Sequence, residues 1–135
     1  MRLEDMTQEE IIKKLLGAAD AVPERTVLLK RLGIPVKIRA LSDKQVDRIQ
    51  EQCTVIRRKR GEEIRRINDE EFNAAVIVAA TVAPNWADPQ LLDKFKASSA
   101  EEAVKRILLA GEVRQLVDAI LDLSGYYTDL DDVKN

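Results

Sequence analysis

The sequence predicts a mainly α-helical domain of the α+β type, with five to six helices and a β-hairpin near the N-terminus. Apolar residues recur at three- to four-residue spacing through most of the chain, which is typical of amphipathic helices. A short stretch after Pro23 changes to the alternation that is typical of strands. The length of 135 residues, with 45% hydrophobic and 34% charged side chains, fits one globular domain.

The first helix is expected to begin near Gln8, because Thr7 and Glu10 have the spacing of a capping box. Its apolar stripe, which fades by Pro23, consists of Ile11, Ile12, Leu15 and Leu16. We treat residues 1–25 as an N-terminal helix and linker. The stripe is a candidate surface for a client protein or for self-association, since it either docks on the body or exchanges onto another chain. Of these two alternatives, we favour docking on the body.

A domain is predicted over residues 26–126, and it begins with the hairpin. Its two strands lie in TVLLKRL and PVKIRAL, on either side of Gly33 and Ile34. Pro35 cannot donate a ladder hydrogen bond, so it should stand at the first residue of the second strand or on an exposed edge.

Helices are predicted through the rest of the chain. A capping box at Ser42 starts a helix whose stripe, Val46, Ile49, Cys53 and Ile56, ends at Arg60 and Gly61. Asn68 starts the most enclosed helix, which contains AAVIVAATVA and ends at Pro84. Three further helices follow: one after Asp88, one from Ser98 or Ser99 to Gly111, and one that ends at Gly125. Residues 127–135 form an acidic tail.

The composition excludes several kinds of catalytic site. The chain has no histidine, so it has no Ser-His-Asp triad, no Cys-His pair and no histidine-ligated metal. The five glycines are isolated and form no phosphate loop. Cys53 lies on an apolar stripe, where a thiol packs as a small hydrophobe. We therefore expect no catalytic residue, no metal and no cofactor.

Trp86 lies in a loop between two predicted helices. It either fills the core from the side or anchors a partner, and we favour the first. The chain has a single cysteine and no recognisable signal peptide. Its longest apolar run has about half of the ~20 residues that span a membrane. We therefore expect a cytoplasmic protein without a membrane partner.

A basic cluster carries six cations against two carboxylates within residues 57–66, a balance of +4. Its cations are Arg57, Arg58, Lys59, Arg60, Arg65 and Arg66. We favour a solvated helix end, with a phosphate or an acidic protein as the alternative contact. The net charge of −2 and the absence of aromatic residues in the cluster argue against nucleic acid as a partner. The rival function is nevertheless a nucleic-acid-associated regulator that uses this cluster.

Three segments in order carry a family resemblance over about residues 26–126. They are LKRLGIPVKIRALSDKQVDRIQEQ, EEFNAAVIVAATVAPNWADPQLLDKF and SSAEEAVKRILLAGEVRQLVDAILDLSGY. The chain resembles the XkdN-like tail assembly chaperones of tailed phages and defective prophages that infect Gram-positive bacteria. The most specific pieces are FNA at the start of the apolar helix, the Pro-Asn-Trp-x-Asp-Pro loop into LLDKF, and the ending that runs from LLAGEV to LVDAILDLSG.

This resemblance implies a small, mostly helical, non-enzymatic protein that acts in the host bacterial cytoplasm and is absent from the mature virion. It implies the tape measure protein as partner, held until the tail tube polymerises around it. The tail tube protein, a longer frameshifted form of the chain and further copies of the chain are additional candidates. The resemblance transfers no binding residues.

Overall fold

The computed structural model describes residues 2–19 and 21–126. The predicted acidic tail, residues 127–135, lies outside this part of the chain. The described elements are a 3-10 helix at Leu3–Asp5, α1 (Gln8–Ala18), β1 (Glu24–Leu29), β2 (Ile34–Arg39), α2 (Asp43–Gln52), β3 (Thr54–Lys59), β4 (Glu62–Ile67), α3 (Asp69–Ala80), β5 (Thr81–Ala83), α4 (Pro89–Phe95), α5 (Ala100–Ile107) and α6 (Ala110–Leu123). The predicted α+β class, rich in helix and with an N-terminal hairpin, is confirmed.

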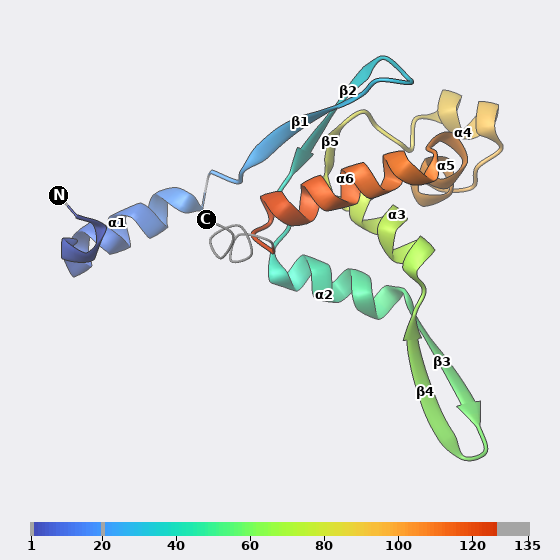
Figure 1. The fold of residues 1–135 in the computed structure, drawn as a ribbon, viewed down its shortest axis with the longest axis horizontal. Coiled ribbons are helices and arrows are strands. Elements are labelled where there is room, and N and C mark those ends of the chain that lie inside the picture. Colours follow the sequence, from blue (N-terminus) through green and yellow to red (C-terminus); the bar gives the residue numbers. More distant parts are fainter. Residues whose placement is uncertain (1, 20, 127–135) are drawn as a thin grey trace.

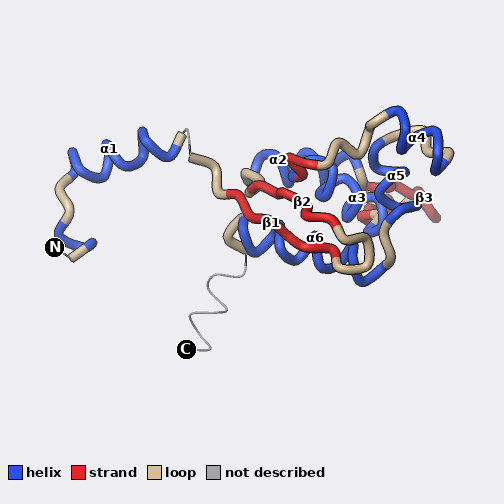
Figure 2. The backbone as a smooth tube through the Cα atoms, turned by 90° about the horizontal axis from the view of Figure 1, so that it is seen from above, coloured by secondary structure: helices blue, strands red, loops and turns tan. Residues whose placement is uncertain are grey.

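The predicted hairpin forms two strands of a three-stranded antiparallel sheet in the order β1-β2-β5. Strand β1 pairs with β2 from Glu24 opposite Arg39 to Leu29 opposite Ile34. Pro35 is the second residue of β2, in the part of this strand that extends beyond its pairs with β5. One face of the hairpin is buried and faces α6 (Figure 2), and its side chains are Val27, Leu29, Val36 and Ile38.

Helix α3 is the central helix of the body and packs against α2, α5 and α6 (Figure 1). Asn68 caps its start by accepting a hydrogen bond from the Glu71 amide at 3.2 Å, as the sequence predicts. Helix α3 is apolar around most of its circumference because it packs against neighbours on several sides. Its buried side chains are Ala74, Val76, Ile77 and Ala80. The core is therefore aliphatic, with Trp86 as its one large aromatic residue among the described positions.

Residues 54–67 form a second hairpin, β3–β4, and the helix predicted to reach Ile56 ends at Gln52. Arg60 and Gly61 have φ values of 54° and 80°, the left-handed backbone that a two-residue hairpin turn requires. Thr54, Val55 and Ile56 are β-branched, which favours strand over helix. The prediction that the basic cluster is a helix end is therefore wrong, because its residues lie on two strands and their turn.

Two other predicted helix ends are corrected. Helix α3 ends at Ala80 rather than at Pro84, because Thr81–Ala83 join the sheet as β5. Helix α5 ends at Ile107, and Gly111 lies inside the first turn of α6.

The two least enclosed elements project from the body in different directions (Figure 1). Helix α1 extends on the side where β1 begins, and β3–β4 extends from the junction of α2 and α3. Within residues 2–19 and 21–126, no helix is long and apolar enough to cross a membrane.

Candidate interaction surfaces

Helix α1 carries the predicted apolar stripe on an exposed helix. The Thr7 hydroxyl accepts a hydrogen bond from the Glu10 amide at 3.2 Å, which caps the helix as predicted. The stripe side chains are 42%, 44%, 62% and 71% exposed at Ile11, Ile12, Leu15 and Leu16. None of the residues described in α1 is buried, so the docking on the body that we favoured is wrong for this structure.

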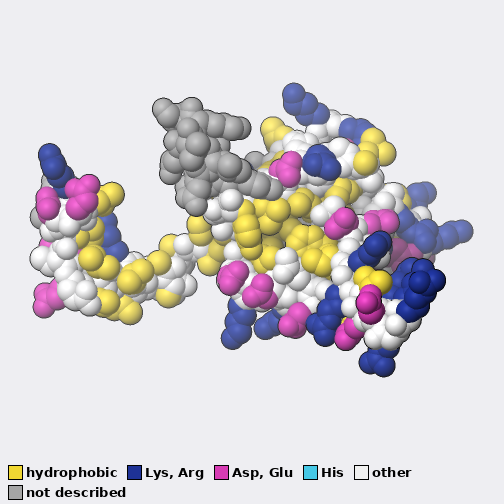
Figure 3. Space-filling view, turned by 60° about the horizontal axis from the view of Figure 1, so that its bottom comes forward, with side chains coloured by type: hydrophobic (Ala, Val, Ile, Leu, Met, Phe, Trp, Pro, Cys, Tyr) yellow, Lys and Arg dark blue, Asp and Glu magenta, His cyan; other side chains and the backbone are white. Residues whose placement is uncertain are grey.

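The β3–β4 hairpin, residues 54–67, is called the arm below. It exposes four β-branched apolar side chains, which are between 39% and 52% exposed: Val55, Ile56, Ile64 and Ile67. All six predicted cluster cations, Arg57, Arg58, Lys59, Arg60, Arg65 and Arg66, lie on the same arm. Figure 3 shows Lys and Arg side chains gathered on this part of the molecule.

The two faces of the arm carry different side chains. Residues directly opposite each other share a face, so Val55 lies beside Arg66, and Ile64 lies beside Arg57. This face lines most of a hollow of about 700 Å³, to which Arg58 and Ile67 of the other face also contribute, and we call it the concave face. The other face pairs Ile56 with Arg65.

Acidic residues lie near the tip of the arm. Glu62 is opposite Lys59, and Glu63 is opposite Arg58. The Glu63 carboxylate also lies 3.4 Å from the Arg65 guanidinium. The excess positive charge is therefore concentrated toward the base of the arm, close to its aliphatic side chains.

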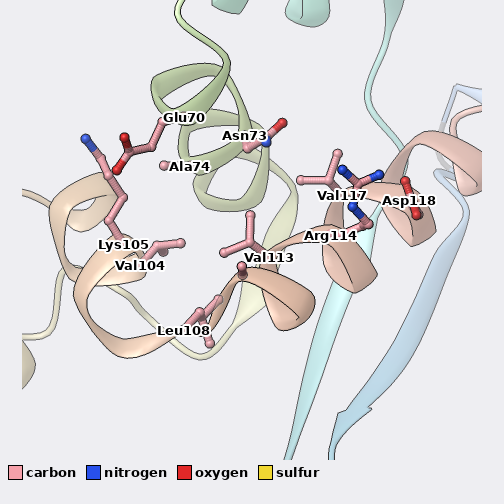
Figure 4. Close-up of a pocket in the computed structure, with 11 residues that line it drawn as sticks. Glu70, Asn73, Ala74, Val104, Lys105, Leu108, Val113, Arg114, Val117 and Asp118 are labelled. Carbon is pink, nitrogen blue, oxygen red and sulfur yellow. The ribbon is translucent and has the colours of Figure 1, made fainter.

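A cleft of about 580 Å³ opens between α3, α5 and α6 (Figure 4). Apolar side chains form its floor: Ala74, Val104, Leu108, Val113 and Val117. Charged side chains form its rim: Glu70, Lys105, Arg114 and Asp118. The Glu71 carboxylate accepts a hydrogen bond from the Lys105 ammonium, which raises the pKa of Lys105. Sequence reasoning assigned the apolar residues to separate helix faces and did not find the cleft, because it depends on how three helices pack.

Two residues considered for reactivity or partner binding belong to the core. Cys53 is 9% exposed, and burial raises the pKa of its thiol, which keeps it protonated and unreactive at neutral pH. Trp86 is 4% exposed, and its indole Nε1 donates to the Thr81 hydroxyl at 3.1 Å, so it fills the core as we favoured. Among the described residues, no three Cys, Asp or Glu side chains are grouped to hold a metal ion.

Comparison with known protein families identifies the chain. A model of the phage XkdN-like tail assembly chaperone proteins matches residues 12–135. The chain belongs to this family. The chaperone match begins inside α1 and so includes Ile12, Leu15 and Leu16, whereas the segments quoted from the sequence begin after Pro23.

Two relatives of this tail assembly chaperone come from Bacillus subtilis strain 168. Protein XkdN of the phage-like element PBSX is 21% identical over 115 residues, which cover 84% of this chain and 78% of XkdN. Protein YqbN is 23% identical over 103 residues, which cover 75% of this chain and 69% of YqbN. The crystal structure of YqbN matches with a TM-score of 0.56 at 20% identity, over 77% of the chaperone and 86% of YqbN. The chaperone therefore shares the YqbN fold.

Proposed function

We propose that this chaperone binds the tape measure protein of its phage and shields it until the tail tube assembles around it. The observation that carries the proposal is the cleft between α3, α5 and α6. Its apolar floor and charged rim suit one amphipathic helix, which places its apolar face inward and its polar edges on the rim. A long helical client with exposed apolar stripes would aggregate unless such a surface covered them.

The surfaces of the chaperone suit binding that must later be reversed. The cleft floor is aliphatic, and none of the described residues that line the cleft is aromatic. Buried aromatic anchors are typical of tight interfaces, which dissociate slowly. An aliphatic contact releases faster, and arriving tube subunits would then displace the chaperone.

The same proposal covers the wider setting of the protein. The chaperone acts in the host bacterial cytoplasm, leaves the assembly before the virion is mature and catalyses no reaction. The tail tube protein, a longer frameshifted form and further copies of the chain are its other proposed partners.

Co-expression with the cognate tape measure protein tests the proposal. Ala110 is exposed at the first turn of α6 and lines the cleft, so Ala110→Glu places a charged side chain in it without disturbing the core. Gln90→Glu is the matched control, because it puts the same side chain in the first turn of α4, away from the cleft. The tape measure protein should stay soluble with the wild type and with Gln90→Glu, and should precipitate with Ala110→Glu. A client that is equally insoluble with and without the chaperone would overturn the proposal.

A nucleic-acid-associated regulator is the second candidate, because the six cations of residues 57–66 project from the body on the arm. Gel shifts at increasing salt separate the two functions. Binding that weakens steeply with salt favours the regulator, and the absence of binding favours the chaperone.

A further inference from the structure

We propose that the charged rim of the cleft selects one register of the client helix, through three rim charges that make no ion pair among the described residues: Glu70, Arg114 and Asp118. This inference rests on the proposed function, because it takes an amphipathic helix of the tape measure protein as the occupant of the cleft. It goes beyond that function by stating which charges the bound segment carries and where they lie.

The aliphatic floor of the cleft cannot select a register by itself. Burial of apolar surface is non-directional, so side chains such as Ala74, Val104 and Val117 accept any apolar stripe of suitable width. A client that repeats such a stripe along its length could therefore dock in many positions. Charged groups across an interface fix the register, because a like charge opposite a rim charge is unfavourable.

The cleft runs along the N-terminal part of α6 and contacts two turns of its occupant. Its α6 side extends from Ala110 to Asp118, a length of about 12 Å at the rise of an α-helix. Figure 4 shows Glu70 and Lys105 at one end of the cleft and Arg114 and Asp118 at the other. A bound helix therefore meets charged groups at both ends of its apolar contact.

One of the four rim charges is already paired within the chain, since the Lys105 ammonium donates to the Glu71 carboxylate. In the part of the chain that the structure describes, the side chains of Glu70, Arg114 and Asp118 make no ion pair. All three are exposed beside the apolar floor. They are therefore available to the charged groups of a bound segment.

Arg114 and Asp118 lie four residues apart, so they are neighbours on one face of α6. A cation that precedes an anion by four residues is the less favourable order for pairing within a helix, which leaves both groups available to a partner. A client helix that lies along α6 therefore places Asp or Glu beside Arg114 and, one turn away, Lys or Arg beside Asp118. On its other flank, a Lys or Arg faces Glu70.

The mixed charge of the rim suits a helix better than it suits a uniformly charged ligand. The charges of the rim residues Glu70, Lys105, Arg114 and Asp118 sum to zero. A nucleic acid or an anionic membrane would meet a carboxylate at each end of the cleft, and each carboxylate would repel it. An amphipathic helix carries charges of both signs beside its apolar stripe.

Binding of client segments to the purified full chain tests the inference. Overlapping segments of the cognate tape measure protein, each labelled with a fluorophore, are titrated with the chaperone, and fluorescence anisotropy gives the dissociation constants. In the rim variant, Arg114→Asp with Asp118→Arg, two charges change places while the net charge and the apolar floor stay the same. Lys44→Asp with Asp47→Lys is the matched control, because it exchanges two exposed charges on α2, whose described residues do not line the cleft. Circular dichroism checks that both variants are folded.

The segments that bind the wild type should carry an acidic and a basic residue one turn apart beside their apolar stripe. The rim variant should bind them about tenfold more weakly, because two attractive contacts are replaced by two like-charge contacts. This difference should shrink at high salt, since the rim is exposed. The control should bind as the wild type does. Exchanging the acidic and basic residues of a bound segment should restore its affinity for the rim variant.

Three results would overturn the inference and leave the proposed function standing. They are equal binding of the same segments by the wild type and the rim variant, bound segments that carry no such charged pair, and a weakened affinity that the exchanged segment does not restore. The absence of binding between the wild type and every segment would instead overturn the proposed function, and the inference with it.

Discussion

Two leucine-to-alanine substitutions test whether α1 is separate from the core in solution. Leu116, in α6, is 0% exposed, and Leu15, in α1, is 62% exposed. Removing a buried leucine side chain costs about 2–5 kcal/mol, since the transfer free energy is lost and a cavity remains. An exposed position outside the core changes the free energy of unfolding by only about 0.5 kcal/mol or less.

The expected effects are large enough to separate. A domain of this size loses about 4 °C in melting temperature for each kcal/mol, so Leu116→Ala should melt about 8–20 °C lower than the wild type. Leu15→Ala should melt within about 2 °C of it. Urea unfolding followed by far-UV circular dichroism measures both free energies. The protein concentration should be low, so that association between copies does not add to the stability.

One outcome would refute the reasoning. If Leu15→Ala lost about 2 kcal/mol at low concentration, its side chain would be packed against the body of the same copy. The stripe would then be part of the core and would not be available to a partner.

Three further predictions concern the body and the arm. The Arg31 guanidinium donates to the Glu112 carboxylate and holds its pKa below the ordinary value of 4.5. The stability that this ion pair contributes is therefore present above pH 4.5 and is lost as the pH falls and the carboxylate is protonated. Glu112→Gln should make the melting temperature less dependent on pH between pH 5 and pH 3. Gly61→Ala forces alanine into a backbone with φ of 80°, so hydrogen exchange of the arm amides should accelerate while the melting temperature stays within a few degrees. Thr81→Val leaves the Trp86 indole N–H without its acceptor and should cost about 1–3 kcal/mol, measured by urea unfolding followed by tryptophan fluorescence.

The sequence predicted the elements whose signals are local. Thr7, Ser42, Asn68 and Ser99 each accept the hydrogen bond that starts a helix, as their spacing indicates. These caps depend on residues within one turn, so no knowledge of the rest of the fold is needed.

The arm was missed because two signals compete over residues 53–56. Ile49, Cys53 and Ile56 fit a helical stripe. Ile56 also belongs to the β-branched run of residues 54–56 that begins β3. The turn at Arg60 and Gly61 decides between them, because two residues with positive φ close a hairpin. Arginine seldom adopts positive φ, so the pair is a weaker turn signal than Asn-Gly.

The sites could be predicted only in part. The stripe of α1 and the cations of the arm follow from residue type and spacing. The surface that the aliphatic side chains of the arm form could not be predicted without the strand register. That register places Val55 and Ile64 on one face with Arg57 and Arg66. The cleft depends on the packing of three helices, and no local pattern records it.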